Sequence, residues 1–249
     1  LIGISSASDI EGEAYLFYGN TLTTCGGYIA TADADVTFTS DGHAAEFGER
    51  IAGNADVDAD GYTDVYIASV NSVYLYLSHG AFPSTVDISQ ADYVFEGEEN
   101  IDDIAFVNNL DGDAYADWLI SSDDKAYVFY ATSILASAVT EWSLDDANID
   151  IEGTSSDPNA SMALTDAGDV DGDGSTDLLV RDGVYGGAYT LYLIKAGSLV
   201  SDTDGTYAIS DAEYILEEEN PDDDSPGGNE AMSMTGDVNN DGLSDILIG

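Results

Sequence analysis

The chain has very few basic residues, cysteines and long apolar runs, and each shortage excludes something. Its 249 residues include 50 Asp and Glu but only four Lys and Arg, for a formal net charge of −46 at pH 7. A surface this negative repels phosphate backbones and anionic lipid, so we expect no nucleic-acid partner. No run approaches the roughly 18 apolar residues of a membrane span, so we expect no membrane insertion. The single cysteine, Cys25, excludes an intramolecular disulfide and is expected to be a buried thiol or to pair between chains.

What the chain does contain is the composition of a folded protein. Hydrophobic residues make up 44% of it, and its aromatics include 16 Tyr, a residue suited to strands with one buried face and one wet edge. A disordered acidic tail would be far less apolar. Charge repulsion nevertheless opposes a compact state, so we expect divalent cations, high salt or both to be needed to stabilise the fold.

Four Asp-rich segments of nine residues recur along the chain, and each is followed at once by an apolar run. They span residues 56–64, 109–117, 169–177 and 237–245. Aromatic-rich stretches recur in the same phase at 14–18, 73–77, 126–130 and 188–192, and shorter β-like stretches at 36–39, 93–95, 149–151 and 214–216. Repetition at this spacing is typical of repeat architectures in which each unit buries its faces against its neighbours.

The short runs between Gly, Asp, Asn and Ser predict an all-β fold. A repeat of about 60 residues with four short antiparallel strands is the size of a propeller blade. The sequence therefore predicts a single β-propeller-like array, residues 1–249, of four such repeats. Short helices within 133–139 or 210–214 are the alternative to loops there.

Each Asp-rich segment has the pattern of a cation-binding loop. Oxygens from the side chains at positions 1, 3, 5 and 9 and from the carbonyl of position 7 can converge on one hard cation, with Gly at position 6 allowing the sharp turn. A set of oxygen ligands without clustered His or Cys favours Ca²⁺ over zinc or copper. The predicted ligands are Asp56, Asp58, Asp60, Tyr62 and Asp64; Asn109, Asp111, Asp113, Tyr115 and Asp117; Asp169, Asp171, Asp173, Ser175 and Asp177; and Asp237, Asn239, Asp241, Leu243 and Asp245.

An EF-hand is excluded because position 12 would have to be a bidentate Glu. That position is Ile67, Ile120, Val180 or Ile248. Up to four calcium ions are expected. The second loop should bind weakest, because it has Asn109 at position 1 and Ala114 in place of Gly, where a positive φ would be strained.

These residues resemble the FG-GAP repeats of integrin α-subunit propellers and their bacterial relatives. The resemblance covers essentially the whole chain, and it implies that each loop joins the first and second strands of a blade and holds calcium at positions 1, 3, 5 and 9. Members of that family typically close a ring of seven blades, whereas four repeats are present here. The motif is clearest in the first repeat and degenerate in the others: Phe47-Gly48 with Ala52-Gly53-Asn54, then Ala105-Phe106-Val107, Ala167-Gly168 and Thr235-Gly236.

The two ends of the chain share the sequence Leu-Ile-Gly, at 1–3 and 247–249. We therefore expect the first repeat to lack its own first strand and loop. The chain would then be an excerpt of a longer protein, a ring closed by its own last strands, or a subunit that exchanges strands with a neighbour.

No catalytic constellation stands out, because His43 and His79 lie at unmatched positions of different repeats, where ordinary polar roles are expected. Three hypotheses follow. The chain is a secreted, non-enzymatic calcium-binding module for adhesion or recognition of a protein or glycan, located outside the cell or at its surface. Alternatively, it is a structural subunit of an extracellular filament, sheath or layer made of copies of itself, or it is an accessory domain of a longer secreted enzyme.

Overall fold

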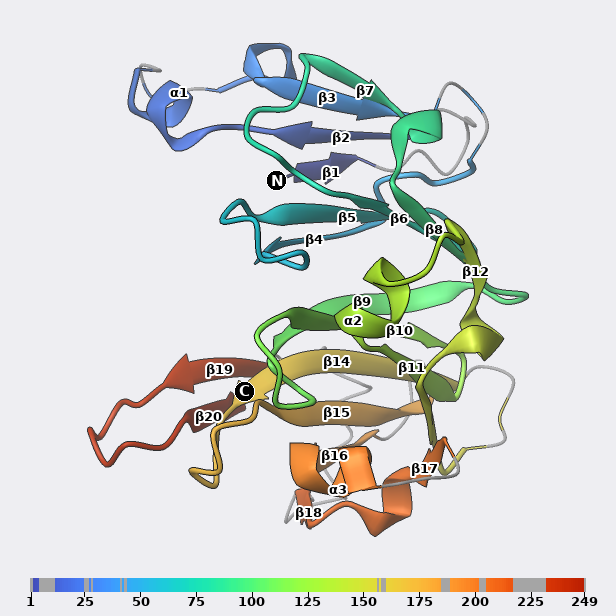
Figure 1. Cartoon of the computed structure of the whole chain (residues 1–249), viewed down its shortest axis with the longest axis vertical. Helices are drawn as coiled ribbons and strands as arrows, with labels where there is room; N and C mark the ends of the chain where they lie inside the picture. The colour runs from blue at the N-terminus through green and yellow to red at the C-terminus, as the bar shows by residue number, and fades with distance from the viewer. Residues whose placement is uncertain are drawn as a thin grey trace, which may run out of the picture. The chain divides into compact units, whose positions relative to one another are not determined.

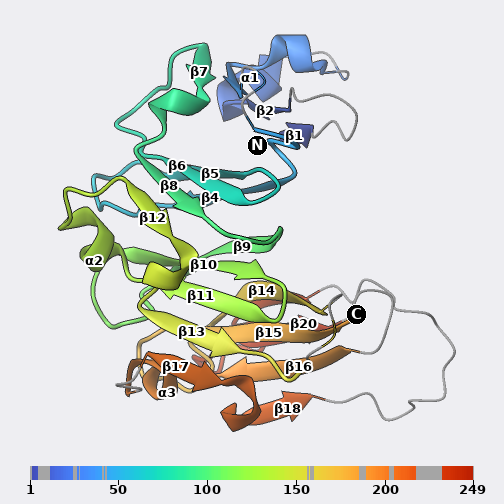
Figure 2. The same ribbon diagram turned by 90° about the vertical axis from the view of Figure 1, so that its right-hand side faces the viewer.

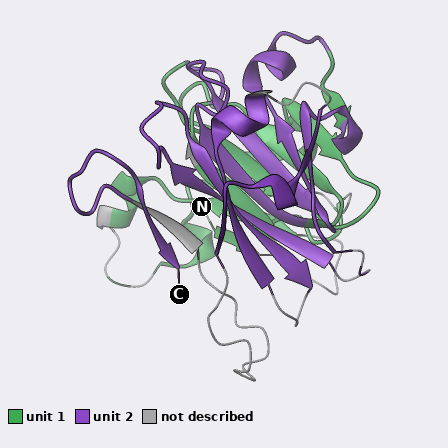
Figure 3. Cartoon of the chain, turned by 90° about the horizontal axis from the view of Figure 1, so that it is seen from below, with its two compact units in different colours: residues 1–56, 60–101, 139–142 green, residues 57–59, 102–138, 143–249 purple. Residues whose placement is uncertain are grey.

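The computed structural model describes residues 2–4, 12–24, 27, 29–40, 42, 44–155, 157, 160–184, 189–201, 205–216 and 232–248. It divides into two compact units, drawn in two colours in Figure 3. The first comprises residues 1–56, 60–101 and 139–142, and the second comprises 57–59, 102–138 and 143–249. Cys25 and His43 lie outside the described residues.

The first unit contains two sheets (Figure 1). One has the order β1-β2-β3-β7, with β1 (Ile2–Ile4), β2 (Glu13–Leu16), β3 (Val36–Thr39) and β7 (Thr85–Asp87). The other has the order β12-β8-β6-β5-β4, with β4 (Arg50–Ala55), β5 (Asp64–Ala68), β6 (Ser72–Tyr76), β8 (Tyr93–Glu96) and β12 (Glu141–Ser143). Short helical turns connect them: α1 (Gly19–Thr24), η1 (Thr31–Asp33) and η2 (Ile88–Gln90).

The second unit repeats this plan (Figure 2). One sheet has the order β17-β13-β11-β10-β9, with β9 (Ile101–Asn108), β10 (Ala116–Ser122), β11 (Lys125–Phe129), β13 (Ile149–Glu152) and β17 (Thr206–Ala208). The next is β14-β15-β16-β18, with β14 (Ala160–Gly168), β15 (Asp177–Val184), β16 (Tyr189–Ile194) and β18 (Tyr214–Leu216). Strands β19 (Met232–Gly236) and β20 (Asp245–Ile248) form a pair, and the helical turns are α2 (Ala131–Leu135), η3 (Leu144–Asp146), α3 (Ala196–Ser201) and η4 (Ile209–Asp211).

The prediction of a β fold is confirmed, since the described residues form mostly strands, in four sheets of four or five and one pair. The apolar runs that follow the first three Asp-rich segments form the most buried strands, whereas the run after the fourth, β20, is partly exposed. Every residue of β5 and β10 is buried, as expected for a short apolar run with neighbours on both faces. The core of the first unit includes Phe38, Phe47 and Tyr76, and that of the second includes Leu119 and Val128.

Three short strands were not predicted. β7, β12 and β17 each pair with the outer strand of the sheet formed by the preceding repeat, and the β3–β7 and β13–β17 pairings are parallel. Each of the three is followed by a 3₁₀ turn. The expected helices are found only in part: α2 spans Ala131–Leu135 and η4 spans Ile209–Asp211, while α1 and α3 were not anticipated.

Candidate metal centres

Each Asp-rich loop lies between two neighbouring strands of one sheet. The first loop (56–64) joins β4 and β5, the second (109–117) joins β9 and β10, the third (169–177) joins β14 and β15, and the fourth (237–245) joins β19 and β20. The loops therefore occupy the same place in every repeat.

In the first, third and fourth loops, the carboxylate at position 1 accepts hydrogen bonds from backbone N–H groups later in the same loop. The backbone N–H groups of Asp60 and Gly61 donate to the two carboxylate oxygens of Asp56, at 3.1 and 2.9 Å. The same two bonds recur at Asp169 and Asp237. Because a carboxylate that accepts two N–H groups is held rigidly, the turn closes with its charged oxygens close together.

The aspartate at position 5 makes a second repeated turn. In all four loops one of its oxygens accepts the N–H of position 7, at 2.7 to 3.0 Å. This Asx turn uses one carboxylate oxygen. The other oxygen contacts His79 in the first loop and accepts from Asn239 in the fourth.

The aspartate at position 9 is the buried member of the set. Asp64, Asp117 and Asp177 are at most 1% exposed. Asp177 accepts the N–H of Val170 within the loop and the N–H of Ala196 beyond β16, both at 2.9 Å, and Asp117 makes the equivalent pair of bonds. Burial raises the pKa of the Asp177 carboxyl, and that of Asp117 to about 7. Position 9 therefore fastens each of the first three loops to the turn after the third strand.

The first and third loops bring three carboxylates together. Oxygens of Asp56, Asp58 and Asp64 lie within 4.8 Å of one another, as do those of Asp169, Asp171 and Asp177. A spacing this short lets one cation contact all three, so these groups could hold a metal ion. In the second and fourth loops, position 1 or 3 is Asn.

His79 forms a further group with the first loop, which was not predicted. Its Nδ1 lies 2.6 Å from Oδ2 of Asp60, and a ligand atom of Asp58 is close to both. The hydrogen bond with His79 lowers the pKa of Asp60. A nitrogen ligand suits transition metals better than calcium, so positions 1, 3 and 9 form the oxygen-only site.

The second loop differs from the others in its backbone. The prediction that Ala114 adopts a strained, positive φ is wrong. Gly61, Gly174 and Gly242 at position 6 all have φ of 93°, but Ala114 does not adopt a positive φ. Asn109, at position 1 of the same loop, adopts a positive φ of 54° instead. Its side-chain Nδ2 donates to the carbonyl of Gly174, 2.9 Å away in the third loop, and its Oδ1 is buried without a hydrogen-bond partner.

Neighbouring loops of the second unit also touch through their backbones. The N–H of Thr176, at position 8 of the third loop, donates to the carbonyl of Asn109, at position 1 of the second. The N–H of Ser244 makes the same bond to the carbonyl of Asp169. The contact thus repeats from loop to loop.

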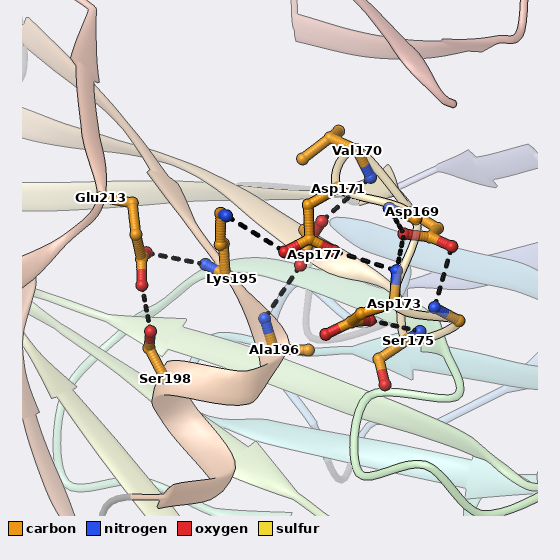
Figure 4. Close-up of polar contacts among 12 residues, drawn as sticks. Asp169, Val170, Asp171, Asp173, Ser175, Asp177, Lys195, Ala196, Ser198 and Glu213 are labelled. Carbon is orange, nitrogen blue, oxygen red and sulfur yellow. Dashed lines mark hydrogen bonds and ion pairs between the residues drawn. The ribbon is translucent and has the colours of Figure 1, made fainter. Parts of the chain in front are cut away.

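Lys195 lies against the third loop (Figure 4). Its Nζ is 3.1 Å from Oδ2 of Asp171, and its backbone N–H donates to Glu213. Glu213 is one of four equivalent residues that accept the N–H following the third strand; the others are Asp35, Asp92 and Asn148. The sequence carries a signal for this contact, because all four follow an alanine just ahead of the fourth strand.

No protein-family model and no curated protein matches the chain. Within the described part of the chain, none of the helices has the length and hydropathy that a bilayer crossing requires.

The two kinds of carboxylate in the third loop should differ in their effect on stability without metal. In Asp177→Asn an amide NH₂ would face one of two buried N–H donors, so we expect a loss of about 1–3 kcal/mol in the free energy of unfolding. The matched variant Asp169→Asn changes a half-buried group whose backbone N–H partners lie in an exposed loop and can bind water instead, so it should lose clearly less. Urea unfolding with excess chelator measures both, and equal losses would show that position 9 does not fasten the loop.

Proposed function

We propose that the chain is a calcium-binding β-propeller module of the integrin α-subunit type that acts outside the cell in recognition or adhesion. The observation that carries this proposal is the repeated loop geometry. The hydrogen bonds around positions 1, 5 and 9 recur in loops far apart in sequence, and they gather three carboxylates within 4.8 Å in the first and third loops.

Calcium is the cation that best fits these groups. The ligands at positions 1, 3 and 9 are all carboxylate oxygens, and Ca²⁺ accepts six to eight oxygens in flexible geometry. Mg²⁺ demands a stiffer octahedron and gives up its water reluctantly. A formal charge of −46 also favours a divalent counter-ion, and extracellular calcium would occupy sites with dissociation constants of about 10⁻⁴ to 10⁻³ M.

The sheet topology supports blades as the repeating element. The strands of one repeat pair in chain order, and in three sheets a short strand of the next repeat pairs with the outer strand. The loop between the first two strands of a repeat contacts the next such loop in the second unit. Stacked blades bury their faces against one another in this way. The proposed blades carry the metal loops on equivalent turns.

A cavity in the first unit supports a recognition role. It has a volume of about 510 Å³ and adjoins the first loop, and its lining includes Tyr18, Tyr62, Ser78 and Phe82. Rings and hydroxyl groups around a concave surface suit a neutral ligand that combines apolar faces with hydrogen-bonding groups. A glycan or an uncharged protein side chain has this chemistry, whereas the surrounding acidic residues disfavour anions.

Calcium binding can be tested directly by calorimetric titration and thermal unfolding. We expect saturable binding and a higher Tm, because a ligand that binds only the native state stabilises it by RT ln(1 + [L]/Kd), or about 1.4 kcal/mol per site at tenfold excess over Kd. NaCl and MgCl₂ at matched ionic strength are the controls, since any cation screens this much charge. If these salts raise the Tm as much as calcium does, the loops are not calcium sites.

The second loop offers a gain-of-function test. Asn109→Asp combined with Ala114→Gly recreates the pattern of the first and third loops, so we expect one additional or tighter calcium site. The matched control is Ala114→Gly alone, which restores the flexible turn without the missing carboxylate. Calorimetry that finds the same stoichiometry and affinity in the wild type and the double variant would contradict the prediction.

A further inference from the structure

The chain has two lysines, Lys125 and Lys195. The side chain of Lys195 contacts the third Asp-rich loop. Its Nζ contacts Oδ2 of Asp171, and it also lies 6.0 Å from the centre of the Tyr214 ring. The side chain therefore sits between two surfaces that attract a cation: the carboxylates of the third loop, and the face of an aromatic ring.

The backbone on both sides of this side chain is pinned. The N–H of Lys195 donates to Oε2 of Glu213 at 3.0 Å, and the N–H of Ala196 donates to Oδ1 of Asp177 at 2.9 Å. Ser198 also donates to Glu213. Because these bonds fix the turn between β16 and α3, the lysine stem starts beside the loop and its flexible end can reach Asp171 (Figure 4).

The equivalent residues in the other repeats carry no positive charge. Leu77 and Tyr130 occupy the same turn, as shown by the same pair of backbone bonds: Leu77 to Asp92 and Ser78 to Asp64, and Tyr130 to Asn148 and Ala131 to Asp117. At the position directly after the third strand, a positive charge is thus specific to the third loop among these three.

We propose that Lys195 is a tethered cation that competes with a bound metal ion at the third loop. Its ammonium group neutralises Asp171 when the loop is metal-free and moves toward Tyr214 and Glu213 when a divalent cation binds. An ammonium 3.1 Å from Asp171 and a Ca²⁺ 2.3–2.6 Å from the same carboxylate would repel each other strongly. This inference rests on the calcium-binding function proposed above.

The competition has a consequence for affinity. The third loop has aspartate at positions 1, 3, 5 and 9, yet it should bind calcium more weakly than those ligands alone would allow. The ion pair is partly exposed, so its removal should tighten binding by about fivefold rather than by orders of magnitude. The first loop has Leu77 at the equivalent position, and its nearby basic group is the imidazole of His79, which contacts Asp60 at position 5 rather than the aspartate at position 3.

Lysine side-chain NMR on the wild-type chain tests the movement without any mutation. With only two lysines, the ¹³Cε and ¹⁵Nζ signals can be assigned by comparison with Lys125→Met. We expect calcium to shift the Lys195 signals and leave those of Lys125 nearly unchanged, because Lys125 pairs with Asp150 and Glu152 away from the loops. Calcium binding that shifts neither lysine, or both equally, would overturn the inference.

Calcium titration of matched variants tests the competition itself. In a background with Asp56→Asn and Asp58→Asn, which disables the first loop, Lys195→Met should bind calcium about fivefold more tightly than the parent. Lys195→Arg should resemble the parent, and Lys125→Met controls for the loss of one positive charge. Equal affinity in Lys195→Met and the parent, or equal tightening in Lys125→Met, would refute the role of Lys195 but leave the proposed calcium-binding function standing. A wild-type chain that binds no calcium would overturn the proposed function as well.

Discussion

Repulsion among carboxylates is the constraint on which the loops depend. Each loop gathers several aspartates into nine residues, and the structure answers with backbone N–H groups aimed at their oxygens. Asp56 and Asp237 each accept two such bonds and Asp169 accepts three, and position 5 accepts one more in every loop. Backbone dipoles reduce the repulsion but add no net charge. A cation is the remaining means of neutralisation, and the proposed calcium and the ammonium of Lys195 both supply one.

In the third loop, the aspartate at position 9 couples the loop to the sheet. Asp177 joins its own loop to the turn after β16, and Glu213 joins that turn to the segment before β18. Two side chains thus connect the second, third and fourth strands of one repeat. Because Asp177 is buried and its partners are backbone groups, the loop is connected to the start of α3, next to Lys195, by hydrogen bonds shielded from solvent.

The sequence predicts the loops and the buried strands because both are local patterns. The nine-residue motif and the apolar run after it lie side by side in the chain, so β5, β10 and β15 could be placed from periodicity alone. β7, β12 and β17 are only three residues long, which is too short to show the alternation of apolar and polar residues that identifies a strand. His79 and Lys195 reach their loops through contacts that span 19 and 24 residues, and no local pattern marks them. Asn109 shows a third kind of failure, since a tertiary contact with Gly174 overrides the turn geometry of its own loop.

Equivalent loops need not have equal chemistry, even on one scaffold. The backbone bonds at positions 5 and 9 are shared, so what distinguishes the loops is the side chain that approaches from outside: His79 at the first and Lys195 at the third. Burial raises the pKa of Asp111 in the second loop, and there Tyr130 rather than a basic residue follows the third strand. A substitution on these turns changes charge next to the ligands while leaving the ligands and the sheet in place. The proposed cation affinity would therefore differ from loop to loop while the fold that carries the loops stays the same.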